Sequence, residues 1–73
     1  ISMLETLELL ESRKQDYNGI ARLGIEALEL KIKGLTIKEI AQMYGVPSSH
    51  VGAWISRSAY KLREDRKFLD SVR

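Results

Sequence analysis

Residues 34–64 read GLTIKEIAQMYGVPSSHVGAWISRSAYKLRE, and this stretch decides the fold of the 73-residue chain. Thr36 and Glu39 form a T-x-x-E capping box, in which each side chain accepts a hydrogen bond from the backbone amide of the other residue. Gly34 suits the left-handed conformation that ends a preceding helix, and Gly45 ends the helix that the capping box begins. Two helices joined by so short a turn have the outline of a helix-turn-helix.

The helix after the turn has two different faces. Pro47 is tolerated at the start of a helix, and Ser48 can cap it. Residues expected to face inward recur with a 3.6-residue period: Val51, Ile55, Ser58, Ala59 and Leu62. The other face carries small residues and then basic ones, which suits close approach to a DNA duplex. The alternatives are an αα-hairpin that binds nothing and a motif that binds protein.

The rest of the chain predicts further helices and no strands. Three of the predicted helices span residues 3–15, 36–44 and 48–68. The remaining one, second in the chain, begins after a cap at Asp16 or Asn18 and runs to Lys33. In the second helix, Ile20, Leu23, Ala27 and Leu30 share one apolar stripe, and Gly24 predicts close packing of a neighbouring helix. We therefore expect one all-α domain over residues 1–73, with a trihelical core that contains the helix-turn-helix (36–58) and an additional N-terminal helix, four helices in all.

The N-terminal helix, residues 3–15, is unusually apolar for a surface helix. Its apolar residues are Met3, Leu4, Leu7, Leu9 and Leu10. We expect this helix to pack on the second one, and the alternative is a seam between copies in a homo-oligomer. Ile1 and Ser2 are interpreted as a cloning remnant before a native Met3, although a chain cut from a longer protein fits equally well.

Charge is divided unevenly along the chain. Residues 1–30 hold three basic and six acidic residues, net −3, whereas residues 31–73 hold nine basic and four acidic residues, net +5. The positive part coincides with the predicted DNA reader, as attraction to phosphates requires.

Composition also argues against several function classes. The chain has no cysteine and one histidine, so we expect no enzymatic activity, no cofactor and no metal site. Apolar runs are too short for a membrane span, and we expect a cytoplasmic protein, in a bacterial nucleoid or a phage-infected cell.

Residues 34–64 resemble region 4 of bacterial sigma factors, the part that reads the promoter −35 element. The elements of that pattern are Gly34, Leu35, Thr36, Glu39, Ile40 and Ala41, then Gly45, Val46 and Pro47, then Val51, Ile55, Ser56, Arg57, Ser58, Lys61, Leu62, Arg63 and Glu64. The resemblance implies sequence-specific DNA binding in transcription, at a promoter or operator, and RNA polymerase as a further partner. Gly52, Ala53 and Trp54 depart from the long polar residues usual there. A tryptophan at the position of Trp54 instead resembles the DNA-reading helices of phage small terminase subunits. This weaker resemblance implies a role in DNA packaging as the alternative to transcription.

The candidate contacts with double-stranded DNA lie on the two helices of the motif. They are Thr36, Lys38, Ser48, Ser49, His50, Gly52, Ala53, Ser56, Arg57 and Lys61. The start of the second helix offers free amides and the positive end of a helix dipole to phosphates, and Ala53 can meet a thymine methyl group. For Arg57 the alternative is a surface ion pair with Glu39 or Asp65. Trp54 is expected at the edge of the core rather than stacked on bases.

Overall fold

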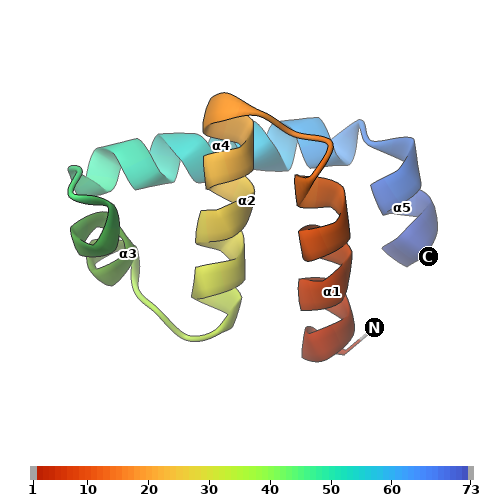
Figure 1. Ribbon diagram of the computed structural model, residues 1–73, viewed down its shortest axis with the longest axis horizontal. Coiled ribbons are helices and arrows are strands. Elements are labelled where there is room, and N and C mark those ends of the chain that lie inside the picture. Colours follow the sequence, from red (N-terminus) through yellow and green to blue (C-terminus); the bar gives the residue numbers. More distant parts are fainter. Residues whose placement is uncertain (1, 73) are drawn as a thin grey trace.

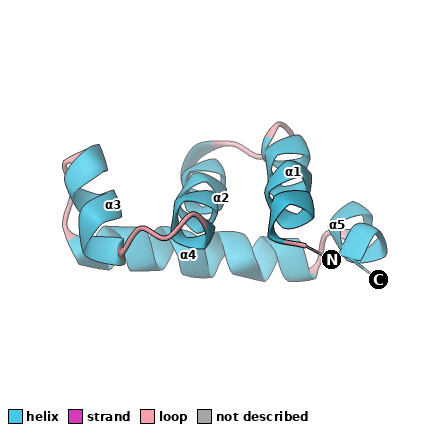
Figure 2. Cartoon of the chain, turned by 90° about the horizontal axis from the view of Figure 1, so that it is seen from below, coloured by secondary structure: helices cyan, strands magenta, loops and turns pink. Residues whose placement is uncertain are grey.

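The computed structural model describes residues 2–72, which form five helices (Figure 1). They are α1 (Met3–Lys14), α2 (Gly19–Ile32), α3 (Ile37–Tyr44), α4 (Ser48–Arg63) and α5 (Arg66–Val72). No strand occurs in this range, which confirms the all-α prediction. In Figure 2, α1, α2 and α3 stand side by side on α4, which forms a layer of its own.

The crossing of α2 over α4 depends on a glycine. A Cβ atom built on Gly24 would collide with the carbonyl oxygen of Trp54, and it would lie 2.6 Å from Oγ and 2.7 Å from Cβ of Ser58. Both Gly24 and Ser58 are buried. The close packing predicted from Gly24 is therefore confirmed, and its partner is α4.

The predicted turn signals between α2 and α4 are confirmed. The amide of Glu39 donates to Oγ1 of Thr36 at 3.1 Å, and the amide of Thr36 donates to Oε1 of Glu39 at 2.9 Å. Gly34 and Gly45 have φ values of 109° and 68°, the left-handed region that favours glycine. The start of α4 differs from the prediction, because Pro47 is the N-cap and Ser48 is already inside the helix.

Two hydrophobic clusters lie on either side of this crossing. The first, here called the α3 cluster, consists of Ala27, Ile40, Ala41 and Val51. The second, here called the α1 cluster, consists of Leu10, Ile25 and Leu62. Because α4 supplies Val51 to one cluster and Leu62 to the other, both fix its position relative to α2.

α1 buries only part of its apolar face inside the molecule. Leu10 is buried and lies in the α1 cluster, as intramolecular packing predicts. Met3 and Leu4 are exposed, so the apolar face expected for residues 3–15 is not buried as a whole. Ile1 lies outside the described residues. Ser2, interpreted above as a remnant, caps α1 through a capping box with Glu5.

The prediction of a single helix over 48–68 is wrong, because the helix is interrupted between the end of α4 at Arg63 and the start of α5 at Arg66. Asp65 explains the break. Its Oδ1 accepts the amide of Phe68 at 3.0 Å, and its Oδ2 accepts Nε of Arg13 at 2.9 Å and the hydroxyl of Tyr17 at 2.7 Å. One carboxylate thus begins α5 and ties it to α1, and the fold has five helices rather than four.

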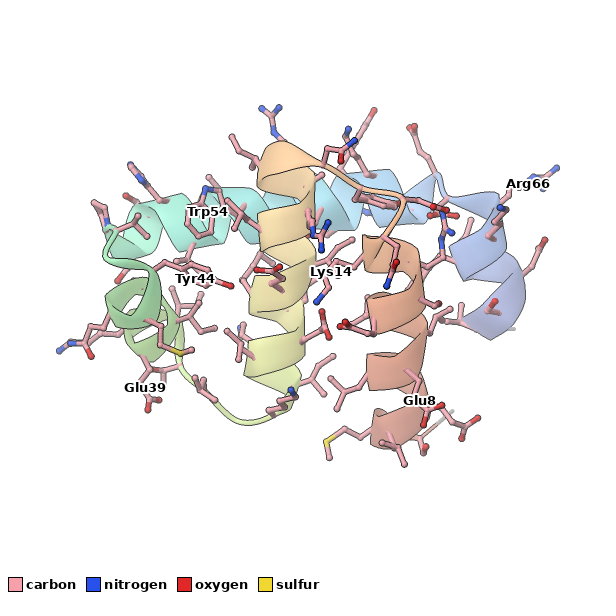
Figure 3. The ribbon with its side chains drawn as sticks, in the orientation of Figure 1. Glu8, Lys14, Glu39, Tyr44, Trp54 and Arg66 are labelled. Atoms are coloured by element: carbon pink, nitrogen blue, oxygen red, sulfur yellow. The ribbon has the colours of Figure 1, made fainter. Side chains whose placement is uncertain are left out.

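A second charged group lies between α1 and α2. Lys14 Nζ is 2.8 Å from Oε2 of Glu11 and 3.2 Å from Oε1 of Glu29, and Figure 3 shows Lys14 between the two helices. Lys14 is thus the ion-pair partner of the buried Oε1 of Glu29, which has no hydrogen-bond partner within residues 2–72. Burial, and then the neighbouring Glu11, raise the pKa of Glu29.

Candidate nucleic-acid interface

The outer side of α4 is uncovered along its length. In Figure 2 no helix lies on the side of α4 that faces away from α1, α2 and α3. The exposed residues of α4 are Ser48, Ser49, His50, Ala53, Ser56, Arg57, Tyr60, Lys61 and Arg63. We call these residues the outer face of α4. A 16-residue helix with such a face has the dimensions of an element that enters a DNA major groove.

The start of α4 offers fewer free amides than expected. The amide of His50 donates to the carbonyl of Pro47 at 3.0 Å, so the prediction of a free amide at His50 is wrong. The amides of Ser48 and Ser49 find no backbone acceptor within residues 2–72. Since neither amide is capped by a side chain, these two remain available to a phosphate.

Small side chains line the outer face where α4 begins. Ala53 and Ser56 are exposed, and a Cβ atom built on Gly52 would meet nothing within 4 Å. Packing therefore does not require glycine at position 52, in contrast to Gly24. Short side chains at these positions allow the helix axis to come close to a ligand surface.

The basic residues of α4 are not used by the fold. Ion pairs in the described part of the chain are made by Arg13, Lys14 and Arg22. Arg57 pairs with neither Glu39 nor Asp65, so its alternative role as a surface ion pair is not realised. Since α4 itself contains no acidic residue, its positive charge is uncompensated along the helix.

A shallow cavity joins the start of α2 to the outer face of α4. Its volume is about 300 Å³, and its lining residues are Ile20, His50, Ala53, Trp54 and Arg57. Ile20 was predicted to share one apolar stripe with Leu23, Ala27 and Leu30, but unlike those residues it is exposed. Ile20 lies in α2 before the crossing with α4 at Gly24, and it therefore lies outside both hydrophobic clusters. The structure thus brings Ile20 to three of the predicted site residues.

Trp54 supports the interface from beneath. Its ring meets that of Tyr44 edge to face, with centroids 5.5 Å apart (Figure 3). The hydroxyl of Tyr44 donates to Oε2 of Glu26 at 2.9 Å, and burial together with this bond raises the pKa of Tyr44 to about 12. Trp54 is half-buried in the α3 cluster, as expected for the edge of a core. Through these contacts α2 and α3 fix the orientation of α4.

Thr36 and Lys38 are exposed at the start of α3. The hydroxyl oxygen of Thr36 already accepts the amide of Glu39, but its hydrogen remains free to donate to a phosphate. These two residues stay predicted contacts.

Two residues of the outer face, Arg63 and Tyr60, are not among the predicted DNA contacts, and the aromatic one is Tyr60. Its ring is exposed on α4, one turn after Ser56. The helical period alone could have found it, because it recurs on the same face as Ala53 and Ser56.

Other kinds of site have little support in residues 2–72. They contain no group of three or more His, Cys, Asp or Glu side chains placed to hold a metal ion. None of the described helices has the length and apolar character needed to span a bilayer.

Comparison with known proteins agrees with this geometry. A family model described as a homeodomain-like domain matches residues 21–64, more than half of the chain. The matched range runs from the first turn of α2 to the residue after α4, and so covers the trihelical unit without α1 and α5. No curated protein and no solved structure matches the chain.

Proposed function

The chain belongs to the homeodomain-like family of helix-turn-helix DNA-binding domains, and on that premise we propose that it reads specific sequences of double-stranded DNA in transcription. α4 is the helix that enters the major groove, and promoter or operator recognition is the specific role. The resemblance of residues 34–64 to sigma factor region 4 supports this role.

One observation carries the proposal: α4 exposes a full-length face with unpaired basic residues and no acidic residue. Arg57 and Lys61 supply charge for phosphates or base edges, and the small residues at 52, 53 and 56 let the helix approach the bases. The amides of Ser48 and Ser49 add donors at the positive end of the helix dipole.

Sequence-specific binding is tested by selection from a pool of duplexes with a randomised centre, using the 73-residue chain. We expect enrichment of one short motif. For about four phosphate contacts, affinity for that duplex should fall roughly a hundred-fold between about 50 and about 200 mM salt. Failure to enrich any motif, or binding that ignores salt, would overturn the proposal.

The mass of the enriched complex gives its stoichiometry. A two-fold complex on two half-sites would support the homo-oligomer alternative for residues 3–15. One copy on one site is expected if α1 packs only within its own chain.

A further inference from the structure

Tyr60 is the one large aromatic side chain on the outer face of α4. Tyr60 is 61% exposed, one turn after the small Ser56, and the other exposed residues near it on this face are the basic Arg57, Lys61 and Arg63. At about 100° per residue, Ser49, Ala53, Ser56 and Tyr60 fall within a narrow stripe. This stripe lies opposite the buried residues Val51, Ser58 and Leu62.

The fold uses the other two tyrosines but not this one. The hydroxyls of Tyr17 and Tyr44 donate to Asp65 and Glu26, and their rings pack against the two hydrophobic clusters. Within residues 2–72, the hydroxyl of Tyr60 has no hydrogen-bond partner, and its ring belongs to neither cluster. Tyr60 therefore offers both an apolar ring and a polar group to a ligand.

The position of Tyr60 matches a ligand that follows the helix. Ser49 and Tyr60 are eleven residues apart, or about 16 Å at ~1.5 Å per residue. That length corresponds to roughly five base pairs at ~3.4 Å each. α5 turns away only after Glu64, and Figure 2 shows no helix over this side of α4. A major groove that receives the start of α4 can continue to Tyr60.

We propose that Tyr60 is a specificity-determining residue, whose ring packs against the C5-methyl group of a thymine at the end of the site remote from Ser49. This inference rests on the proposed DNA binding. The thymine methyl is the apolar group that base edges present in the major groove, which is why an aromatic ring there favours thymine. The hydroxyl of Tyr60 donates to a phosphate oxygen beside that base.

The test combines a base scan with substitutions. Each thymine of the enriched duplex is replaced in turn by deoxyuridine, which removes only the methyl group. Affinity is measured for the wild-type chain, Tyr60→Ala, Tyr60→Phe and Met43→Ala. Met43 is a matched control, because it is 63% exposed and lines a cavity with Glu11 and Lys14 of α1. Circular dichroism compares the folding of all four proteins.

For the wild-type chain, deoxyuridine at one remote position should weaken binding about four-fold, the value expected for one buried methyl group. Tyr60→Ala should weaken binding to the thymine duplex about ten-fold and abolish the effect of that one substitution. Tyr60→Phe should keep the effect and lose about three-fold in overall affinity, and Met43→Ala should match the wild type.

Two results would overturn the inference while leaving DNA binding intact. One is a deoxyuridine profile that is the same in Tyr60→Ala as in the wild type. The other is a wild-type chain that is indifferent to every such substitution. Failure of the wild-type chain to select any duplex would instead refute the proposed function, and the role of Tyr60 with it.

Discussion

The α3 cluster and the α1 cluster hold opposite halves of α4 by different means. The α3 cluster is completed by apolar and aromatic side chains, among them Leu30, Trp54 and Ile55. The α1 cluster is also completed by apolar and aromatic side chains, among them Leu28 and Phe68, but charged groups around Asp65 and Glu29 border it in addition. The start of α4 is thus held by packing. Its end is held partly by charges, whose contribution depends on pH.

The largest effect should come from Gly24, which lies between the two clusters. Gly24→Ala places a methyl group against the Trp54 carbonyl and the Ser58 side chain. Overpacking of this kind against backbone should cost about 3 kcal/mol or more and loosen both clusters together. Urea unfolding measures the loss. Gly52→Ala is the matched control and should stabilise the helix by about 1 kcal/mol, because its methyl group meets nothing. Equal effects of the two substitutions would contradict the proposed crossing.

The next largest effect should come from Asp65, which stabilises only the side of the molecule that contains the α1 cluster. Asp65→Ala removes the acceptor of Arg13, Tyr17 and the Phe68 amide, and should cost about 2 kcal/mol at neutral pH. α5 should lose protection from hydrogen exchange first, while α3 keeps its protection. The exposed Asp70 provides the control substitution, Asp70→Ala, for which no loss is expected. Equal loss of protection in α3 and α5 would mean that the two sides are not separable.

The contribution of Asp65 to the free energy of unfolding depends on pH. Burial alone raises the pKa of Asp65, but the hydrogen bonds from Tyr17, the Phe68 amide and Arg13 outweigh it and hold the pKa below its usual value. Stability from a depressed carboxyl pKa is present above the unfolded value and is lost as pH falls through the folded value. The difference between wild type and Asp65→Ala should therefore shrink below about pH 4.

Substitution of Arg57 tests the outer face of α4, to which neither hydrophobic cluster contributes a side chain. Arg57→Ala should weaken binding to the enriched duplex by about 1 to 2 kcal/mol, because an unpaired guanidinium is lost from the outer face. Stability should not change. Lys31→Ala removes one positive charge from the exposed end of α2, outside that face, and should leave affinity nearly unchanged. A similar loss of affinity in both variants would indicate that net charge, and not α4, governs binding.

The smallest effect concerns Glu29 and has the opposite dependence on pH. Its pKa is raised in the fold, so the ionised form costs stability, and the wild type gains stability as pH falls through the folded value. Glu29→Gln should therefore stabilise the chain by about 1 kcal/mol at pH 7, and the difference should disappear only below about pH 4. Urea unfolding at the two pH values measures it, with the exposed Glu8→Gln as control. Destabilisation by Glu29→Gln at pH 7 would mean that its ion pair with Lys14 outweighs its burial.

Local signals predicted the α3 side of the molecule well. The capping box of Thr36 and Glu39 and the left-handed Gly45 involve residues close together in sequence, and each was found as predicted. Gly24 was also informative, because a glycine inside a helix has few reasons other than close packing. The all-α fold and the helix-turn-helix followed from these features.

Features that depend on distant residues were not predictable in the same way. The helical period continues from Lys61 to Phe68 and hides the break at Asp65. The bond from the Phe68 amide to Asp65 is local, but the bonds from Arg13 and Tyr17 that tie this carboxylate to α1 come from 52 and 48 residues away. Ile20 fits the stripe of α2 but precedes the crossing of α2 with α4 at Gly24, and no periodicity reveals where a crossing begins. For the interface, the exposure of the outer face is established, while its individual DNA contacts remain predictions.

The most direct test of the account is a titration of the 15N-labelled chain with the enriched duplex, followed by amide chemical shifts. We expect the largest changes on the outer face of α4, at Ser49, Ala53, Ser56 and Arg57, with α1 nearly unchanged. Changes concentrated on α1, or none on α4 at saturating duplex, would contradict it.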